Sequence, residues 1–227
     1  MRQHRLALGL LALMWTLGAG RPVDAGAWMQ RPKTGFAALD LRYRPTQGRE
    51  LGFYGTYGLS ERLTLGLDIN DTSRGSAHAL GFVRLPLRQA DSGWQIATEL
   101  AVGANRDAGH WLVMQRYGLS VGRGVQLGAR SGWVTADLTR ESRSGGYSKA
   151  WKLDATLGLS PPKGRRLAPM FQIELHRPDD GAGTFALLPS LRLSRRAKRT
   201  WLGGLEWRRT QGEDQVLGIR FGLWQDF

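Results

Sequence analysis

A serine in a short glycine-flanked string is the first candidate for chemistry in this chain. Gly118-Leu119-Ser120-Val121-Gly122 matches the nucleophile string G-x-S-x-G, which needs a sharp strand-to-helix turn to expose its serine. Apolar and polar residues alternate through the string and into Arg123, and no helical pattern follows. His110 lies earlier on the same expected strand, about 33 Å from Ser120. We therefore interpret Ser120 as an ordinary strand residue between two glycines.

Other motifs that carry catalytic or metal chemistry are missing from the sequence. It contains no H-E-x-x-H, EF-hand loop, P-loop or G-x-G-x-x-G motif, and no cysteine that could be a nucleophile or ligand. Asp179-Asp180-Gly181 has oxygen ligands of the kind that calcium prefers, but its composition is typical of a solvated turn. The sequence thus predicts no cofactor, no metal site and no catalytic residues.

The chain of 227 residues has a formal net charge of +13. Such a balance suits nucleic acid, an anionic membrane surface or a charged rim. The run Arg195-Arg196-Ala197-Lys198-Arg199 resembles a nucleic-acid patch, but expected strands flank it on both sides. We therefore interpret the run as a basic turn.

The N-terminus predicts export. Arg2 and Arg5 precede an apolar run at residues 6–19, which is typical of a signal peptide and shorter than a spanning helix needs. Small residues predict cleavage before Gly26, so that residues 1–25 form the signal peptide; an earlier cleavage or an uncleaved anchor is the alternative. Export argues against nucleic acid as the partner.

The rest of the chain alternates with a period of two. Leu63, Leu65, Leu67 and Ile69, for example, are separated by polar residues or glycine, as on a strand with one apolar and one polar face. Twelve such segments are found, most of them long enough to cross a bilayer as tilted strands. Their expected ranges are 35–45, 49–59, 62–71, 77–88, 94–105, 110–122, 125–141, 147–160, 167–177, 185–195, 200–209 and 215–227.

Two features decide which face points outward. The polar faces contain many glycines and charges, which suits a lumen. The apolar faces carry aromatic residues near strand ends, where the girdles of a membrane barrel lie: Tyr43, Trp94, Trp111, Trp151, Trp201 and Trp207. The pattern predicts an all-β, transmembrane, antiparallel up-and-down barrel of about 12 strands, and any number from 10 to 14 is compatible with it. A soluble β sandwich or barrel, with its apolar faces inward, is the alternative.

The fourth and seventh segments are less regular. Leu80 and Phe82 disagree in parity with the apolar residues that follow them, and Trp133 is adjacent to Val134. A β-bulge or a miscounted strand would explain either irregularity. The connection between the sixth and seventh segments is expected at Gly122-Arg123-Gly124, because glycines favour turns.

The C-terminal residues Val216–Phe227, VLGIRFGLWQDF, resemble the last strand of Gram-negative outer-membrane β-barrel proteins. Ile219, Phe221, Leu223 and Phe227 match the pattern that the barrel assembly machinery reads in that family, and Gln225 departs from it. The resemblance implies a location in the bacterial outer membrane, with lipids and the assembly machinery as partners and with both mature termini in the periplasm. Residues 26–34 would then be a periplasmic N-terminal segment and residues 35–227 the barrel.

The polar faces supply candidate lumen residues of both charges. They are Asp40, Arg42, Arg44, Glu50, Asp68, Arg84, Glu99, Arg116, Lys152, Asp154, Glu174, Arg192, Glu206, Arg208 and Arg220. Eight are basic and seven acidic. Together with the strand number, this balance predicts a porin-like channel for small hydrophilic solutes, the solute being unknown.

Two other functions stay open. The connections expected in the periplasm are strongly basic, which suits a non-conducting structural barrel that binds lipid headgroups or a periplasmic partner. The second is a lipid hydrolase. Its histidine would be His78, His110 or His176, which lie near expected outer strand ends. Its serine would be Ser76, Ser142, Ser144 or Ser148.

Overall fold

The computed structural model describes residues 26–89, 93–107, 109–145, 149–196 and 198–227. The expected signal peptide, residues 1–25, lies outside the described residues. Within them no helix is long and apolar enough to cross a membrane.

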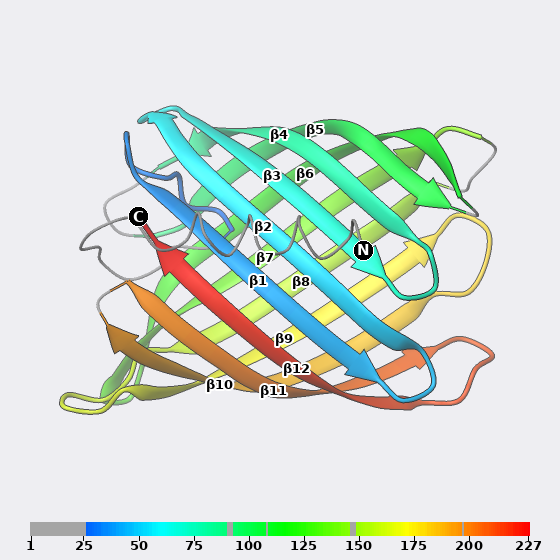
Figure 1. Ribbon diagram of the computed structural model, residues 1–227. Coiled ribbons are helices and arrows are strands. Elements are labelled where there is room, and N and C mark those ends of the chain that lie inside the picture. Colours follow the sequence, from blue (N-terminus) through cyan, green and yellow to red (C-terminus); the bar gives the residue numbers. More distant parts are fainter. Residues whose placement is uncertain (1–25, 90–92, 108, 146–148, 197) are drawn as a thin grey trace.

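The described residues form twelve strands, and each strand pairs antiparallel with its neighbours in sequence. Pairing of the first with the last strand closes the barrel (Figure 1). The prediction of a twelve-stranded up-and-down barrel is therefore confirmed. The strands are β1 (Gly35–Arg44), β2 (Gly48–Ser60), β3 (Leu63–Thr72), β4 (Ala77–Arg88), β5 (Gln95–Asp107), β6 (His110–Leu127), β7 (Arg130–Arg143), β8 (Ala150–Leu159), β9 (Leu167–Pro178), β10 (Thr184–Arg196), β11 (Arg199–Thr210) and β12 (Val216–Asp226).

The two ends of the barrel are distinguished by the chain termini. Gly35 N–H donates to the carbonyl oxygen of Phe227 at 2.8 Å, and Phe227 N–H donates to that of Gly35 at 2.9 Å. We call this end the terminal end and the opposite one the far end. Because β1 runs away from the terminal end, Arg44 lies near the far end.

Apolar side chains cover the outside and polar ones the inside. On β12, Ile219 and Phe221 are 42% and 57% exposed, whereas Arg220 between them is 6% exposed. The same inversion repeats around the barrel, because successive side chains on a strand point to opposite faces. An apolar exterior around a polar interior is the arrangement of a transmembrane barrel and excludes the soluble alternative.

Aromatic side chains near the strand ends also face outward. Trp94, Trp111, Trp151 and Trp201 are exposed. Cations lie against three of these rings. The Arg140 guanidinium is 5.1 Å from the centre of Trp151, that of Arg106 is 5.7 Å from Trp111, and that of Arg123 is 5.9 Å from Trp94. Such pairs suit the boundary between hydrocarbon and headgroups.

The prediction of a turn at Gly122-Arg123-Gly124 is wrong. These residues lie inside β6, which pairs with β7 without a register shift as far as Leu127 and Arg130. The connection is the turn at residues 128–129, where Gly128 has a φ of 59°. Gly122 is needed for packing instead, because a Cβ there would lie 2.6 Å from the ring of Trp28.

The irregular parities of β4 and β7 have a different cause from the one expected. Leu80 and Phe82 point into the barrel and are buried with Met114. The register shift in β4 comes later, between Pro86 and Arg88. In β7, Trp133 also points inward, where Arg192 lies against its ring. Apolar side chains inside the lumen, not a miscount, break both patterns.

Candidate functional site

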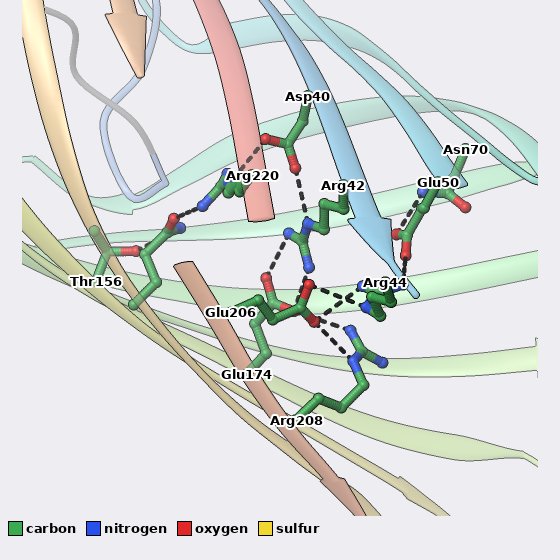
Figure 2. A network of polar contacts seen from close by, with 11 residues as sticks. Asp40, Arg42, Arg44, Glu50, Asn70, Thr156, Glu174, Glu206, Arg208 and Arg220 are labelled. Atoms are coloured by element: carbon green, nitrogen blue, oxygen red, sulfur yellow. Dashed lines mark hydrogen bonds and ion pairs between the residues drawn. The ribbon is translucent and has the colours of Figure 1, made fainter. Parts of the chain in front are cut away.

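The lumen is crossed by ion pairs between strands that are not neighbours. Arg42 on β1 makes a two-fold contact with Glu174 on β9, at 2.8 and 2.7 Å, although three strands separate β1 from β9. Asp40 accepts from Arg42 at 2.8 Å and from Arg220 at 2.5 Å. Arg220 also donates to Gln172 on β9. These contacts join two parts of the wall (Figure 2).

The same network continues toward the far end. Arg44 contacts Glu206 on β11 at 2.9 Å and Glu50 on β2 at 2.8 Å. Arg208 adds a second cation to Glu206 at 2.8 Å, and Asn70 donates to Glu50 at 2.9 Å. Figure 2 shows the Arg44, Glu206 and Arg208 side chains converging on one point. Each carboxylate in this cluster is thus neutralised within the lumen.

A second network lines the wall from β2 to β6. Glu99 accepts from Arg84 at 2.9 Å and from Arg116 at 3.0 Å. Arg116 reaches Asp68 on β3 at 2.5 Å, and Tyr54 accepts from Arg84 at 2.7 Å. The two arginines and Glu99 are buried, so this network forms a fixed, charged wall.

Carboxylates without cations face these networks from β7 and β8. Asp137 and Asp154 are directly opposite each other, and Asp154 is in turn opposite Glu174. Ion pairs reach Glu174 but, across the described ranges, neither Asp137 nor Asp154. Both line a cavity inside the lumen. One sector of the lumen therefore carries two neighbouring carboxyl groups to which no described cation is paired.

Arg192 is a buried cation near the terminal end. Its guanidinium lies 4.2 Å from the centre of Trp133 and 5.7 Å from that of Trp224, and it donates to the carbonyl oxygen of Leu159 at 2.6 Å. The described part of the chain offers it no carboxylate partner. Aromatic rings thus take the place of a counter-ion here.

The lumen holds a cavity of 540 Å³. Its walls include Arg42, Arg116, Asp154 and His176, and Gly26 forms part of its boundary. Residues 26–34, expected in the periplasm, fold into the barrel, where Ala27 is 1% exposed and the backbone N–H of Gln30 donates to the Thr64 hydroxyl at 3.1 Å. Polar groups of both signs therefore surround a space that the N-terminal segment bounds in part, at Gly26.

All fifteen candidate lumen residues lie on the inward faces of their strands, and the two networks and the cavity bring most of them together. The candidate set from the sequence omits Asp137 and Glu141 because they lie in the irregular seventh segment, and Arg143 because it lies beyond the expected end of that segment at residue 141. They also line the cavity. They bring the lumen charges to nine basic and nine acidic, from eight and seven.

Serine–histidine pairs are not assembled in the part of the lumen that the structure describes. His78 lies 3.4 Å from an oxygen of Asp68, and Ser120 hydrogen-bonds to Asp137. No hydrogen bond joins a described serine hydroxyl to a histidine ring, and no group of three described acidic or histidine residues is placed to hold a metal ion. The described side chains of the lumen can bind a solute through charge, hydrogen bonds and aromatic contacts.

The twelve-stranded closed barrel with a charged lumen defines a class: transmembrane barrels of the outer-membrane type. No protein-family model and no curated protein sequence matches the chain. The KdgM porin has a TM-score of 0.60 and 8% identity, over 86% of this chain and 99% of that one. The NanC porin has a TM-score of 0.55 and 12% identity, over 82% and 98%.

A third solved structure adds a channel to these porins. The COG4313 outer membrane channel from Pseudomonas putida F1 has a TM-score of 0.53 and 13% identity, over 91% of this chain and 100% of that one. The likeness at these identities is one of fold. The chain has the fold of outer-membrane porins and channels, and the resemblance to Gram-negative outer-membrane barrels is confirmed at that level.

Proposed function

We propose that the protein is an outer-membrane channel for small hydrophilic solutes. The observation that carries the proposal is the 540 Å³ cavity inside the barrel, lined by charged and hydrogen-bonding side chains. A barrel with a purely structural role does not need such a space. A polar solute that leaves water, by contrast, needs replacement hydrogen bonds along its path, and this lining can supply them.

The charge pattern suggests how such a lumen would act on a solute. Arg42, Arg208 and Arg220 lie on strands β1, β11 and β12, and Asp137 and Asp154 lie on β7 and β8. A polar solute in the cavity would meet ion-paired cations on one side and carboxyl groups without a paired cation on the other. Such a lining offers charges and hydrogen bonds to hydrophilic solutes and favours them over apolar ones. The KdgM porin was also solved in complex with disordered oligogalacturonate, an acidic sugar; for this chain we propose the broader class of small polar solutes.

The location and partners follow from the same proposal. Export by the signal peptide would bring the chain to the outer membrane, where its apolar exterior contacts lipids. The assembly machinery would read the C-terminal strand through Ile219, Phe221, Leu223 and Phe227. The terminal end would then face the periplasm, and the turns at the far end would face outside.

Conductance of the purified protein in a planar lipid bilayer tests the proposal. We expect discrete current steps, with uptake of small sugars or amino acids by loaded vesicles. A variant with Arg42→Glu should shift the ion selectivity toward cations, while Glu213→Gln, in an exposed turn at the far end, should not. Absence of both conductance and uptake from folded, heat-modifiable protein would overturn the channel, and turnover of lipid substrates would favour a hydrolase.

A second candidate is a non-conducting structural barrel, which is favoured by the ion pairs that cross the lumen and by the chain segment inside it. Its basic terminal-end turns would bind anionic headgroups or a periplasmic partner. Neutralising Arg165, Arg166 and Lys198, with Lys163 left unchanged, tests this role. We expect the variant to bind anionic vesicles more weakly than the wild type does. Equal binding by the variant would contradict this role.

A further inference from the structure

Residues 26–34 follow a chord across the lumen. At one side, Pro32 forms a bridge with Gly58 of β2. At the other side, Trp28 packs against Gly122 of β6, and Gly26 lies beside Asp137 of β7. The segment thus spans the barrel between walls that are several strands apart.

The wall is shaped to receive this segment. A Cβ on Gly58 would overlap the backbone of Arg31, and a Cβ on Gly122 would lie 2.6 Å from the ring of Trp28. Glycine in a strand often marks a close approach of another backbone or ring. Both glycines face inward. The space left by their missing side chains is therefore inside the lumen, where Arg31 and Trp28 occupy it.

The segment begins at an unpaired carboxylate. An ideal Cβ on Gly26 would lie 3.2 Å from Oδ2 of Asp137, so this oxygen is in contact range of the backbone of the first described residue. Asp137 bonds to Ser120, but within the described ranges it has no ion pair, and its direct neighbour Asp154 is also a carboxylate. A cation at Gly26 would offset the cost of this charge in a narrow lumen.

Cleavage before Gly26, which the sequence predicts, creates a cation at that place. We infer that Asp137 is the binding site for the α-ammonium group of a mature chain that begins at Gly26, and that residues 26–34 form an internal plug which narrows the lumen. The predicted cleavage site and the carboxylate without an ion pair are independent of each other, because the first comes from the sequence and the second from the barrel wall. The pairing does not depend on channel activity, whereas the effect of the plug on current rests on the proposed function.

Amine labelling of the exported protein tests the pairing. The protein is purified from outer membranes, its N-terminus is determined by mass spectrometry, and it is treated at pH 7 with an amine-reactive ester, which favours α-amines over lysines. A carboxylate partner keeps the amine protonated, so we expect Asp137→Asn to label about tenfold faster than the wild type. Glu213→Gln is the control, because it removes a carboxylate from an exposed turn at the far end, and it should label at the wild-type rate.

Conductance tests the plug. Deletion of residues 27–31 keeps Gly26 at the cleavage site and removes Trp28 and Ala27 from the lumen. We expect a several-fold larger single-channel conductance, and Trp28→Ala, which leaves the backbone in place, should give a smaller increase. Heat-modifiable mobility shows that each variant has folded.

The outcomes separate the two proposals. A mature N-terminus other than Gly26, or equal labelling of the wild type and Asp137→Asn, would overturn the binding site. Conducting wild type and deletion variants with equal currents would overturn the plug. If no folded variant conducts, the channel proposal and the effect of the plug on current fail together, while the labelling still decides the role of Asp137.

Discussion

Arg42 and Glu174 hold two distant strands of the barrel together through the lumen. Their two contacts of 2.8 and 2.7 Å connect β1 with β9. Backbone hydrogen bonds alone would fix only neighbouring strands. A side-chain pair that crosses the lumen acts as a strut and at the same time reduces the open cross-section. The structure thus couples the rigidity of the barrel to the width of its interior.

Variants of this pair should therefore change selectivity with opposite signs. Arg42→Met leaves Glu174 in excess and is expected to favour cations, while Glu174→Gln leaves Arg42 in excess and should favour anions. The double variant should return toward the selectivity of the wild type with a larger conductance. Each single change is expected to destabilise the barrel by about 1–3 kcal/mol, since both side chains are partly solvated. Reversal potentials in a salt gradient and urea unfolding in vesicles measure the two effects; shifts of the same sign would contradict the assignment.

Asp154 offers a cleaner change of charge, because no cation among the described residues forms an ion pair with it and would be left without a partner in the variant. Asp154→Asn should move ion selectivity toward anions, and Asp154→Lys should move it further in that direction. The effect should be largest at low salt, because the screening length is about 10 Å at 0.1 M and about 3 Å at 1 M. Glu213→Gln removes the same charge from an exposed turn and is the control. Selectivity equal to that of the wild type would argue that solutes do not pass Asp154.

The sequence predicts the barrel well because alternation is a local signal. Ile219 and Phe221 alternate with Gly218 and Arg220 whether or not the rest of the chain is known, and the exposure of these residues follows the same alternation. The parity of a strand thus assigns a charged residue to the inside. Partners within the lumen are not local. Nothing in the sequence near Arg42 points to Glu174, because the contact depends on the closure of the barrel.

Residues that break alternation show where this signal ends. Trp133 and Phe82 are apolar and face inward, so an analysis based on apolar and polar faces treats them as irregular. Gly122 looks like a turn residue but provides space for Trp28. The path of residues 26–34 has no sequence signal of its own, because it is determined by contacts with strands that come later in the chain.

Glycines that face inward should be less replaceable than those that face lipid. A Cβ on Gly66 would overlap the ring of Phe82, whereas a Cβ on Gly203 would have nothing within 4 Å. Gly66→Ala should therefore destabilise the barrel by about 1–3 kcal/mol, as overpacking does. Gly203→Ala should be neutral or stabilise it by about 0.5 kcal/mol, because it reduces the freedom of the unfolded chain. Urea unfolding in vesicles compares the two, and equal effects would contradict the inward packing of Phe82.

Phe227 lies at the seam of the barrel, where β12 pairs with β1, and is also the last residue of the expected assembly signal. Its backbone exchanges two hydrogen bonds with Gly35, and its ring occupies the space that a Cβ on Gly35 would need. Phe227→Ala keeps the backbone bonds, so the protein refolded into lipid vesicles without assembly machinery should still show heat-modifiable mobility. In cells the resemblance predicts several-fold slower assembly, because the terminal aromatic is missing. Phe171→Ala removes an exposed aromatic from β9 and serves as control. Pulse-labelled cells report the fraction of folded barrel over time. Equal assembly rates for the two variants would show that Phe227 is not read as a signal, and a failure of Phe227→Ala to refold in vesicles would assign its effect to the seam.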